Sequence, residues 1–220
     1  MTDLLTLAHT GSKNIMKARR QILFLQSDIT KILGVILLAV FALLFSNPEA
    51  QAQPIIYLVR HAEKLPDWPK GALSDFQPLS AEGILRARKL AALFQETSLK
   101  AIYSSLTTRT LHTAFPLSQK LHLPIKFAKA CQDTAAIAAF LSDLAAQYAD
   151  DDAVLLVSHS NIIPYLLLAM GLPADCHKEM GFTRSPHHSW IVVEGYDKIW
   201  KVEKNQDGRK ECSRFQTIPF

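Results

Sequence analysis

The sequence of residues 54–64 is PIIYLVRHAEK, an apolar run followed directly by an arginine and a histidine. The apolar run predicts a buried β-strand over residues 54–59. In α/β proteins, ligands bind in the crevice at the carboxyl ends of parallel strands, which is where Arg60 and His61 would lie. A guanidinium group can hold a phosphoryl group through two parallel hydrogen bonds, and an imidazole can attack its phosphorus. This stretch therefore predicts a strand that ends in a phosphoryl-binding site.

Strand and helix patterns alternate along the rest of the chain. Strands are expected at residues 54–59, 101–103, 124–127 and 153–157. Helices are expected after Ser80 and at residues 107–121, 134–148 and 161–170. This alternation predicts an α/β fold, a three-layer sandwich with a mostly parallel central sheet flanked by helices. Residues 189–194 and 199–202 are expected to pair with each other at an edge, near Gly195, and the last dozen residues carry little pattern and are expected to fray.

The first 52 residues have the features of an export signal. Lys13, Lys17, Arg19 and Arg20 precede an uncharged apolar stretch at residues 32–45, and Ala50-Gln51-Ala52 follows it. A basic region, an apolar core of about 7–15 residues and a small-residue site are typical of a secretory signal peptide. We therefore expect a signal peptide in residues 1–52, or a membrane anchor if it is uncleaved, with one domain at residues 53–220. Met1 and Met16 are both possible starts.

Composition and cysteine content are consistent with an exported globular domain. The chain has 220 residues, 49% hydrophobic and 20% charged, with a net charge of +4. It contains no basic block with interleaved aromatic residues, so no nucleic-acid partner is expected. Export, to the periplasm or the outside of the cell, would permit disulfides. Of Cys131, Cys176 and Cys212, at most one pair can form inside the chain, and the sequence leaves the pair and the oligomeric state open.

In two later segments, as at residues 54–61, an apolar strand is followed directly by polar residues. The strand at residues 101–103 is followed by Ser104-Ser105 and, on the first turn of the next helix, by Arg109. The strand at residues 153–157 is followed by His159 and Ser160. If these strands are parallel neighbours, their ends converge with Arg60 and His61 and form a pocket. Helix N-termini in such a pocket would also favour an anion.

These segments resemble those of the histidine phosphatase superfamily, also called the phosphoglycerate mutase-like family. The matching stretches are YLVRHAE (57–63), PLSAEG (78–83), IYSS (102–105) with Arg109-Thr110 and Thr113-Ala114, and LLVSHS (155–160). They occur in the order of the family and span nearly the whole domain. The chain departs from the usual pattern in Ala62 and Ser160, which stand where the family often has glycine.

The resemblance implies a role for each residue of the pocket. His61 would be the nucleophile that forms a phosphohistidine, while Arg60, Arg109 and His159 would hold the phosphoryl oxygens. Ser160 lacks the G-x-S-x-G context of a serine nucleophile. It is therefore expected to contact the phosphate of the substrate and not to attack it. No cofactor and no metal are expected, since arginines supply the positive charge. The general acid is left open between Glu63, beside the nucleophile, and Asp133, after the third strand region.

The resulting hypothesis is a metal-independent phosphomonoester hydrolase acting on a small phosphorylated substrate. A mutase of the phosphoglycerate mutase type is a first alternative, and the short domain leaves little room for insertions that would enclose an intermediate. A non-catalytic phosphate-binding envelope protein is a second. A membrane partner is expected only if the segment at residues 32–45 stays uncleaved. Sugar phosphates, lipopolysaccharide core phosphates and phosphoprotein histidines all remain possible substrates.

Overall fold

The computed structural model describes residues 53–186, 188–204 and 211–220. These residues belong to the second of two compact units, Gln51–Phe220. The signal peptide or anchor expected in residues 1–52 lies outside the described residues. None of the helices in the described part of the chain is long and apolar enough to cross a membrane.

A six-stranded sheet forms the centre of the domain, with the strand order β3-β2-β4-β1-β7-β8. Its strands are β1 (Ile55–Arg60), β2 (Leu99–Ser104), β3 (Ile125–Phe127), β4 (Ala153–Ser158), β7 (Lys198–Val202) and β8 (Phe215–Pro219). The first four are parallel to one another, β7 is antiparallel to β1, and β8 is antiparallel to β7. The mostly parallel α/β sheet expected from the sequence is confirmed.

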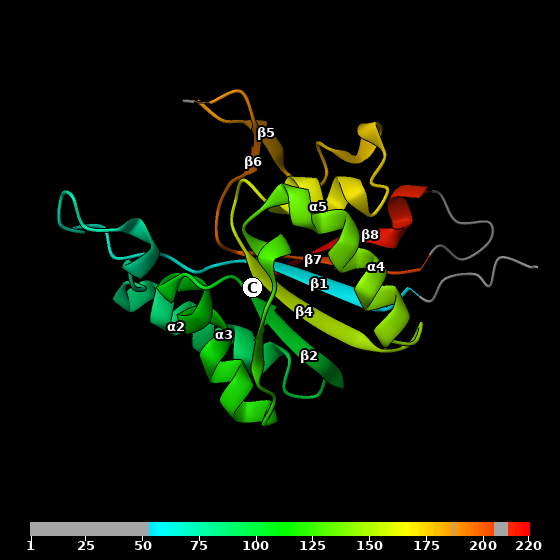
Figure 1. The fold of residues 1–220 in the computed structure, drawn as a ribbon, viewed down its shortest axis with the longest axis horizontal. Helices are drawn as coiled ribbons and strands as arrows, with labels where there is room; N and C mark the ends of the chain where they lie inside the picture. The colour runs from blue at the N-terminus through cyan, green and yellow to red at the C-terminus, as the bar shows by residue number, and fades with distance from the viewer. Residues whose placement is uncertain (1–52, 187, 205–210) are drawn as a thin grey trace, which may run out of the picture. The chain divides into compact units, whose positions relative to one another are not determined.

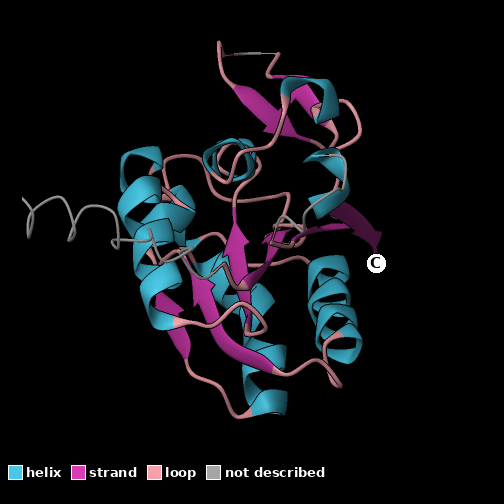
Figure 2. Ribbon diagram, turned by 90° about the vertical axis from the view of Figure 1, so that its right-hand side faces the viewer, coloured by secondary structure: helices cyan, strands magenta, loops and turns pink. Residues whose placement is uncertain are grey.

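Helices cover both faces of this sheet (Figures 1 and 2). The four helices are α2 (Ala81–Leu93), α3 (Thr108–Leu121), α4 (Ile137–Gln147) and α5 (Ile163–Ala169). Short 3₁₀ turns add η1 (Ser74–Phe76), η2 (Lys129–Cys131), η3 (Thr134–Ala136), η4 (Ala174–Cys176) and η5 (Glu211–Arg214). Because successive strand residues point to opposite faces, Leu58 packs with α4 and α5 in one core, whereas Val59 packs with α2 and α3 in the other. The domain is therefore a three-layer sandwich.

The pairing expected for the last strands was wrong. Residues 191–193 form β6 (Ile191–Val193), which pairs with β5 (Phe182–Arg184) in a separate two-stranded sheet. β7 instead joins the main sheet beside β1. Gly195 has a φ of 75°, in the left-handed region that favours glycine, and it turns the chain from one sheet to the other. Burial of Ile199 and Trp200 in the two cores favours β7 as a main-sheet strand.

The C-terminus does not fray as the sequence suggested. β8 pairs with β7 along five residues, and Phe215 and Phe220 are buried. A disulfide joins Cys176 in η4 to Cys212 in η5, and Cys131 is the remaining, buried thiol. Long-range pairing and a cross-link stabilise this segment, and neither leaves a periodic pattern in the sequence.

Candidate active site

The carboxyl ends of β1, β2 and β4 meet at one edge of the main sheet. Arg60 is the register partner of Ser158, and Ser104 is the partner of Val157, so the three strands end at the same level. The residues that follow these ends are His61, Ser105 and His159. The convergence expected from the sequence is therefore present.

His61 is held as a neutral imidazole with one free nitrogen. Its Nδ1 lies 2.8 Å from the carbonyl oxygen of Ala62, which can only accept, so Nδ1 carries the proton. Burial lowers the pKa of His61 to about 3, and the nearby His159, Arg109 and Arg60 act in the same direction. Nε2 therefore keeps an unshared electron pair, as a nucleophile requires.

His159 is oriented by an arginine on one side and a hydroxyl on the other. Arg109 Nη2 lies 3.5 Å from His159 Nδ1, and because guanidinium nitrogens only donate, Nδ1 accepts. The proton is then on Nε2, which donates to Ser105 Oγ at 3.0 Å. Ser105 Oγ is also 2.8 Å from Thr110 Oγ1 on α3. Burial, followed by the charges of Arg109 and Arg60, lowers the pKa of His159 to about 3.

The rings of the two histidines lie side by side, with centroids 5.4 Å apart. Arg60 is the last residue of β1, and Arg109 lies on the first turn of α3, where unpaired backbone N–H groups also favour an anion. Burial lowers the pKa of both arginines, and for Arg109 the positive charge of Arg60 contributes to this. A cluster of two guanidiniums and two neutral imidazoles is suited to hold a phosphoryl dianion.

Thr113 connects the nucleophile loop to α3. Its hydroxyl accepts a hydrogen bond from the Ala62 amide at 2.9 Å and donates one to the Arg109 carbonyl at 2.7 Å. The backbone beside His61 is thus attached to the helix that carries Arg109. Thr113 belongs to the stretch that resembles the family, yet its role was not foreseen, because a side-chain bridge between two elements leaves no periodic signal.

Glu63 lies close to the nucleophile in sequence, but its carboxylate is bound to α2. Arg86 Nε donates to both carboxylate oxygens, at 2.7 and 2.9 Å, and Arg86 Nη2 is 2.6 Å from Oε1. The Glu63 carbonyl accepts from the Ser80 amide and lies 2.2 Å from where a Cβ of Gly83 would be. Only glycine fits there, which explains the last residue of the PLSAEG stretch.

The two other predicted residues lie in different surroundings. Asp133 is half-exposed, forms an ion pair with Lys129 at 3.0 Å and accepts from the Ala135 amide at 2.9 Å. The hydrogen bond from Lys129 and then that from Ala135 lower the pKa of Asp133. Ser160 is half-buried, and its carbonyl accepts from the Val193 amide at 2.9 Å, which attaches β6 beside His159. A substrate contact of the Ser160 hydroxyl stays a prediction.

One aromatic residue of this site was missed from the sequence. Tyr196, in the turn between β6 and β7, places its ring 4.0 Å from the Arg60 guanidinium and 6.0 Å from the His61 ring. Tyr196 stands more than 130 positions after Arg60 in the chain, in a segment that the sequence predicted to form an antiparallel pair at an edge. Because β7 pairs antiparallel with β1, the turn before β7 lies at the carboxyl end of β1. This pairing was not predicted, so Tyr196 could not be assigned to the site from the sequence.

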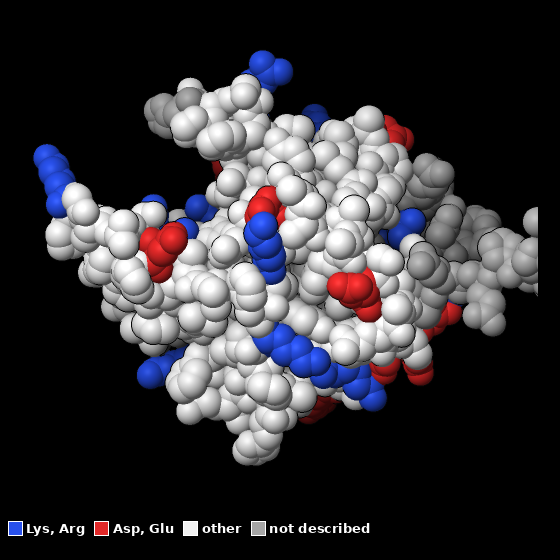
Figure 3. All heavy atoms as spheres, in the orientation of Figure 1, with Lys and Arg blue, Asp and Glu red and all other residues white. Residues whose placement is uncertain are grey.

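The surface above these residues is hollowed. Figure 3 shows a hollow between the β5–β6 sheet and the loop of residues 65–78, with Lys or Arg atoms inside it. Arg109 Nη1 donates to the Ser74 carbonyl at 2.7 Å and so attaches this loop to the site. Leu73 and Phe76, on either side of that contact, are 69% and 63% exposed. The mouth of the site therefore has an apolar rim.

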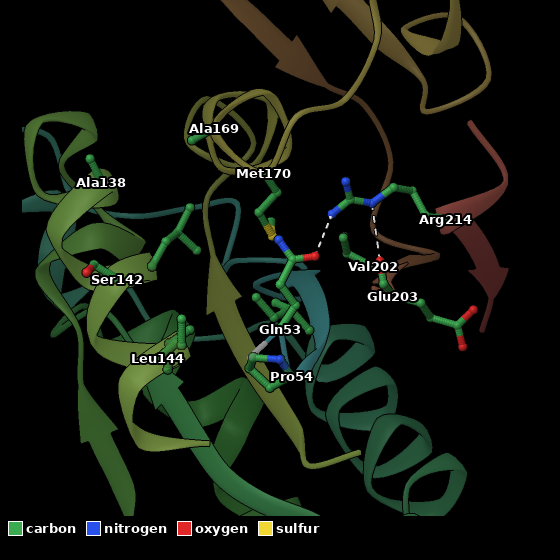
Figure 4. A pocket seen from close by; sticks show the side chains of 13 residues that line it. Gln53, Pro54, Ala138, Ser142, Leu144, Ala169, Met170, Val202, Glu203 and Arg214 are labelled. Carbon is green, nitrogen blue, oxygen red and sulfur yellow. Dashed lines mark hydrogen bonds between the residues drawn. The ribbon is translucent and has the colours of Figure 1, made fainter. Parts of the chain in front are cut away.

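A separate cavity of about 340 Å³ lies at the opposite end of β1 (Figure 4). Its lining includes Gln53 and Pro54, parts of α4 and the end of α5. Arg214 donates to the Gln53 side chain at 3.3 Å and to the Glu203 carbonyl at 3.2 Å. Six strand residues span about 20 Å, so this cavity is not part of the arginine and histidine cluster.

The cysteines offer neither a metal site nor a nucleophile. Within the described ranges, one group of potential ligand atoms lies within 4.8 Å of one another, from Asp175, Cys176 and Cys212. The two sulfurs are bonded to each other and are not thiolates. Burial raises the pKa of Cys131 to about 12, which leaves this thiol unreactive.

Comparisons with known proteins show similarity to phosphatases. The model of the histidine phosphatase superfamily (branch 1) matches residues 56–138. The lipopolysaccharide core heptose(II)-phosphate phosphatase of Escherichia coli O9:H4 (strain HS) is 29% identical over 120 residues. That alignment covers 53% of this chain and 58% of the relative, so it spans less than two thirds of the relative's length.

Solved structures share the fold at low sequence identity. The protein histidine phosphatase SixA complexed with tungstate has a TM-score of 0.52 at 19% identity, covering 74% of this chain and 94% of that one. The mycobacterial glucosyl-3-phosphoglycerate phosphatase with VO3 has a TM-score of 0.54 at 16% identity, covering 76% and 98%. The resemblance noted in the sequence is confirmed. Residues 56–138 match the model of the histidine phosphatase superfamily, and the domain has the fold of these solved phosphatases.

Proposed function

We propose that this domain is a phosphomonoester hydrolase that acts through a phosphohistidine intermediate on His61. The observation that carries the proposal is the state of His61, a buried neutral imidazole whose Nδ1–H is held by the Ala62 carbonyl. Its free Nε2 lies in a cluster with Arg60, Arg109 and His159. That is the arrangement needed to attack a phosphoryl group and hold its oxygens.

The arginines would supply most of the catalysis. Phosphoryl transfer depends mainly on positioning and on stabilising charge at the oxygens of the transferred group. Arg60 and Arg109 provide two permanent positive charges, and the His159 ring lies beside Arg109 in the same cluster. With these charges in place, the proposed reaction uses no metal ion. The burial that lowers the pKa of His61 also keeps the nucleophile unprotonated at neutral pH.

The substrate class proposed first is a phosphorylated sugar of a cell-envelope glycolipid. The support is the curated relative, whose name specifies a heptose phosphate of the lipopolysaccharide core. The exposed Leu73 and Phe76 at the rim are compatible with a large, partly apolar substrate.

Export of the domain is part of the same proposal. The disulfide between Cys176 and Cys212 supports an oxidising compartment. The apolar segment at residues 32–45, after a basic region, would be the export signal or an anchor.

The test is turnover of a generic aryl phosphate by the purified protein, with a metal chelator present. We expect hydrolysis by the wild type and a loss of at least about 10³-fold in His61→Ala, on the scale of removing a nucleophile. His122→Asn is a matched control, because His122 caps the far end of α3 with a φ of 53° that asparagine tolerates. This control should keep its activity.

A second measurement separates hydrolysis from the alternatives. Enzyme mixed with ³²P-labelled substrate and quenched should carry an acid-labile, base-stable label that His61→Ala lacks. Transfer of the label to a second position of the substrate, in place of release as phosphate, would indicate a mutase. Tight phosphate binding with no turnover would indicate a non-catalytic protein and would overturn the proposal.

A further inference from the structure

Tyr196 forms the wall of the site on the side of Arg60. Arg60 Nη2 donates to Tyr196 Oη at 3.2 Å, and Arg60 Nη1 donates to the Gly195 carbonyl at 3.0 Å. The guanidinium carbon also lies 4.0 Å from the centroid of the Tyr196 ring, the geometry of a cation–π contact. The phenol is therefore in direct contact with an arginine proposed to bind the phosphoryl group.

The same phenol lies near the rest of the cluster. The rings of Tyr196 and His61 have centroids 6.0 Å apart. Burial lowers the pKa of Arg60 and of Arg109, and Tyr196 is close enough to act in the opposite direction on both. Tyr196 is therefore adjacent both to His61 and to Arg60, within reach of a phosphoryl group held by them.

The turn that carries Tyr196 is well anchored. Gly195, with its φ of 75°, begins the turn, and a Cβ there would lie 2.8 Å from an Asp197 carboxylate oxygen. The Phe220 amide donates to the Asp197 carbonyl at 3.0 Å, and β7 follows directly. Because β7 pairs with β1, the position of Tyr196 relative to His61 is set by a sheet register.

The carboxylates considered from the sequence are poorly suited to donate a proton. Both carboxylate oxygens of Glu63 accept hydrogen bonds from Arg86 Nε, so this side chain is bound to α2. Asp133 is paired with Lys129, which lowers the pKa of Asp133, so its carboxyl holds no proton to donate at neutral pH. The hydrolysis of a phosphate ester of a simple alcohol nevertheless requires an acid for the leaving oxygen.

We propose that Tyr196 is this acid, an inference that rests on the proposed phosphatase function. Its oxygen already accepts from Arg60, and no described residue accepts its own O–H, so that proton is free to be donated. Tyrosine is an established type of general acid. The phenolate formed would be stabilised by the adjacent Arg60 guanidinium.

The proposed reaction has two steps, the formation and the hydrolysis of phospho-His61. In the first, His61 Nε2 forms a bond to phosphorus while the bond from phosphorus to the leaving oxygen breaks, and that oxygen takes the proton of Tyr196. The products are an alcohol, phospho-His61 and a phenolate. In the second, water attacks phosphorus and gives a proton to the phenolate as the phosphorus–nitrogen bond breaks. This releases phosphate and restores neutral His61 and neutral Tyr196.

The experiment compares leaving groups in wild type and Tyr196→Phe. Phenylalanine keeps the ring under Arg60 and removes only the hydroxyl. On an alkyl phosphate, whose alcohol needs a proton to leave, kcat/KM should fall about 10²-fold or more. On para-nitrophenyl phosphate, whose leaving group needs no proton at neutral pH, it should fall less than about 5-fold. Tyr57→Phe is the matched control. Tyr57, on β1, packs against Phe94 at the end of α2, so this variant should show neither change.

Other outcomes would overturn the inference in distinguishable ways. Equal losses on both substrates would mean that Tyr196 only positions Arg60, and no loss on either would mean that it takes no part. The para-nitrophenyl phosphate activity reports that the variant is folded. Absence of turnover in the wild type on both substrates would refute the proposed function, and the role of Tyr196 with it.

Discussion

The parallel strands and the antiparallel strands contribute to this domain in different ways. β1, β2 and β4 end at one level, and the residues that follow them include His61, Ser105 and His159. Strands β7 and β8 extend the main sheet, and β5 and β6 form a separate small sheet. The disulfide joins η4, which precedes β5, to η5, which precedes β8. From this antiparallel part, Tyr196 is the one residue with a proposed chemical role.

The difference follows from topology. Parallel strands that run side by side bring their carboxyl ends to the same edge, so polar residues far apart in sequence meet there. Antiparallel strands alternate in direction and bring only a single turn to that edge. We therefore expect substitutions in the parallel part to reduce activity most, and substitutions in the antiparallel part to reduce stability most.

Among substitutions that leave His61 in place, the largest effect is expected for Arg109→Ala. It removes a charge from the proposed phosphoryl site and the contact that attaches the loop at Ser74. We expect kcat/KM to fall about 10³-fold, or about 4 kcal/mol of transition-state stabilisation. Arg109→Lys should recover only part of this, because lysine keeps the charge but cannot form two parallel hydrogen bonds.

Arg184→Ala supplies the matched control for Arg109. Arg184 is an exposed arginine on β5, in the antiparallel part. Steady-state kinetics on one phosphomonoester should show it within about 2-fold of the wild type. Similar losses for both arginines would show that the chemistry is not confined to the ends of the parallel strands.

The next effect is a loss of stability in the antiparallel part. The double variant Cys176→Ser and Cys212→Ser opens a cross-link between positions 36 residues apart. The unfolded-chain entropy of such a loop corresponds to about 3 to 4 kcal/mol of unfolding free energy. Urea denaturation should show this loss, while kcat/KM of the folded variant stays within about 3-fold of the wild type.

Reduction of the wild-type protein provides a check on the same comparison. A thiol reductant should lower the stability of the wild type towards that of the double variant and leave the double variant unchanged. In the contrary outcome, the reductant would leave the unfolding free energy of the wild type unchanged, and the double variant would be equally stable. These two results together would mean that the disulfide does not stabilise this part.

The two parts also differ in how well the sequence predicted them. The buried strands β1 and β4 are continuous apolar runs, and α2 begins after Ser80, whose hydroxyl accepts from the Gly83 amide. Such local patterns predict elements directly. The pairing of β6 with β5, and of β7 with β1, depends on contacts between distant segments, and so these pairings could not be derived from periodicity.

The site shows the same limit at the level of single residues. Arg60, His61, Arg109 and His159 all lie near the carboxyl ends of predicted strands, so their convergence could be predicted on the condition that these strands are parallel neighbours. The partnership of Glu63 with Arg86 depends on the rotamers of two side chains on different elements. Tyr196 could not be found without the register that places β7 beside β1.

The smallest effect concerns the pH dependence of stability, and it belongs to the parallel part. The folded-state pKa values of His61 and His159 are about 3, against about 6.5 for unfolded histidine. Between pH 6.5 and 3 the unfolded chain binds more protons, so stability is lost as the pH falls through that window. From pH 7.5 to 5.5 the loss is about 1.4 kcal/mol per histidine, or about 3 kcal/mol for the pair.

Urea denaturation of the wild type and of a His61→Asn, His159→Asn double variant, at pH 7.5 and 5.5, measures this effect. Asparagine is polar and does not titrate, so the double variant should lose about 3 kcal/mol less than the wild type between the two pH values. Comparing each protein with itself removes any constant cost of the substitutions. If both proteins lost the same amount, the two histidines would not be buried neutral groups, and the nucleophile at the end of β1 would need another means of staying unprotonated.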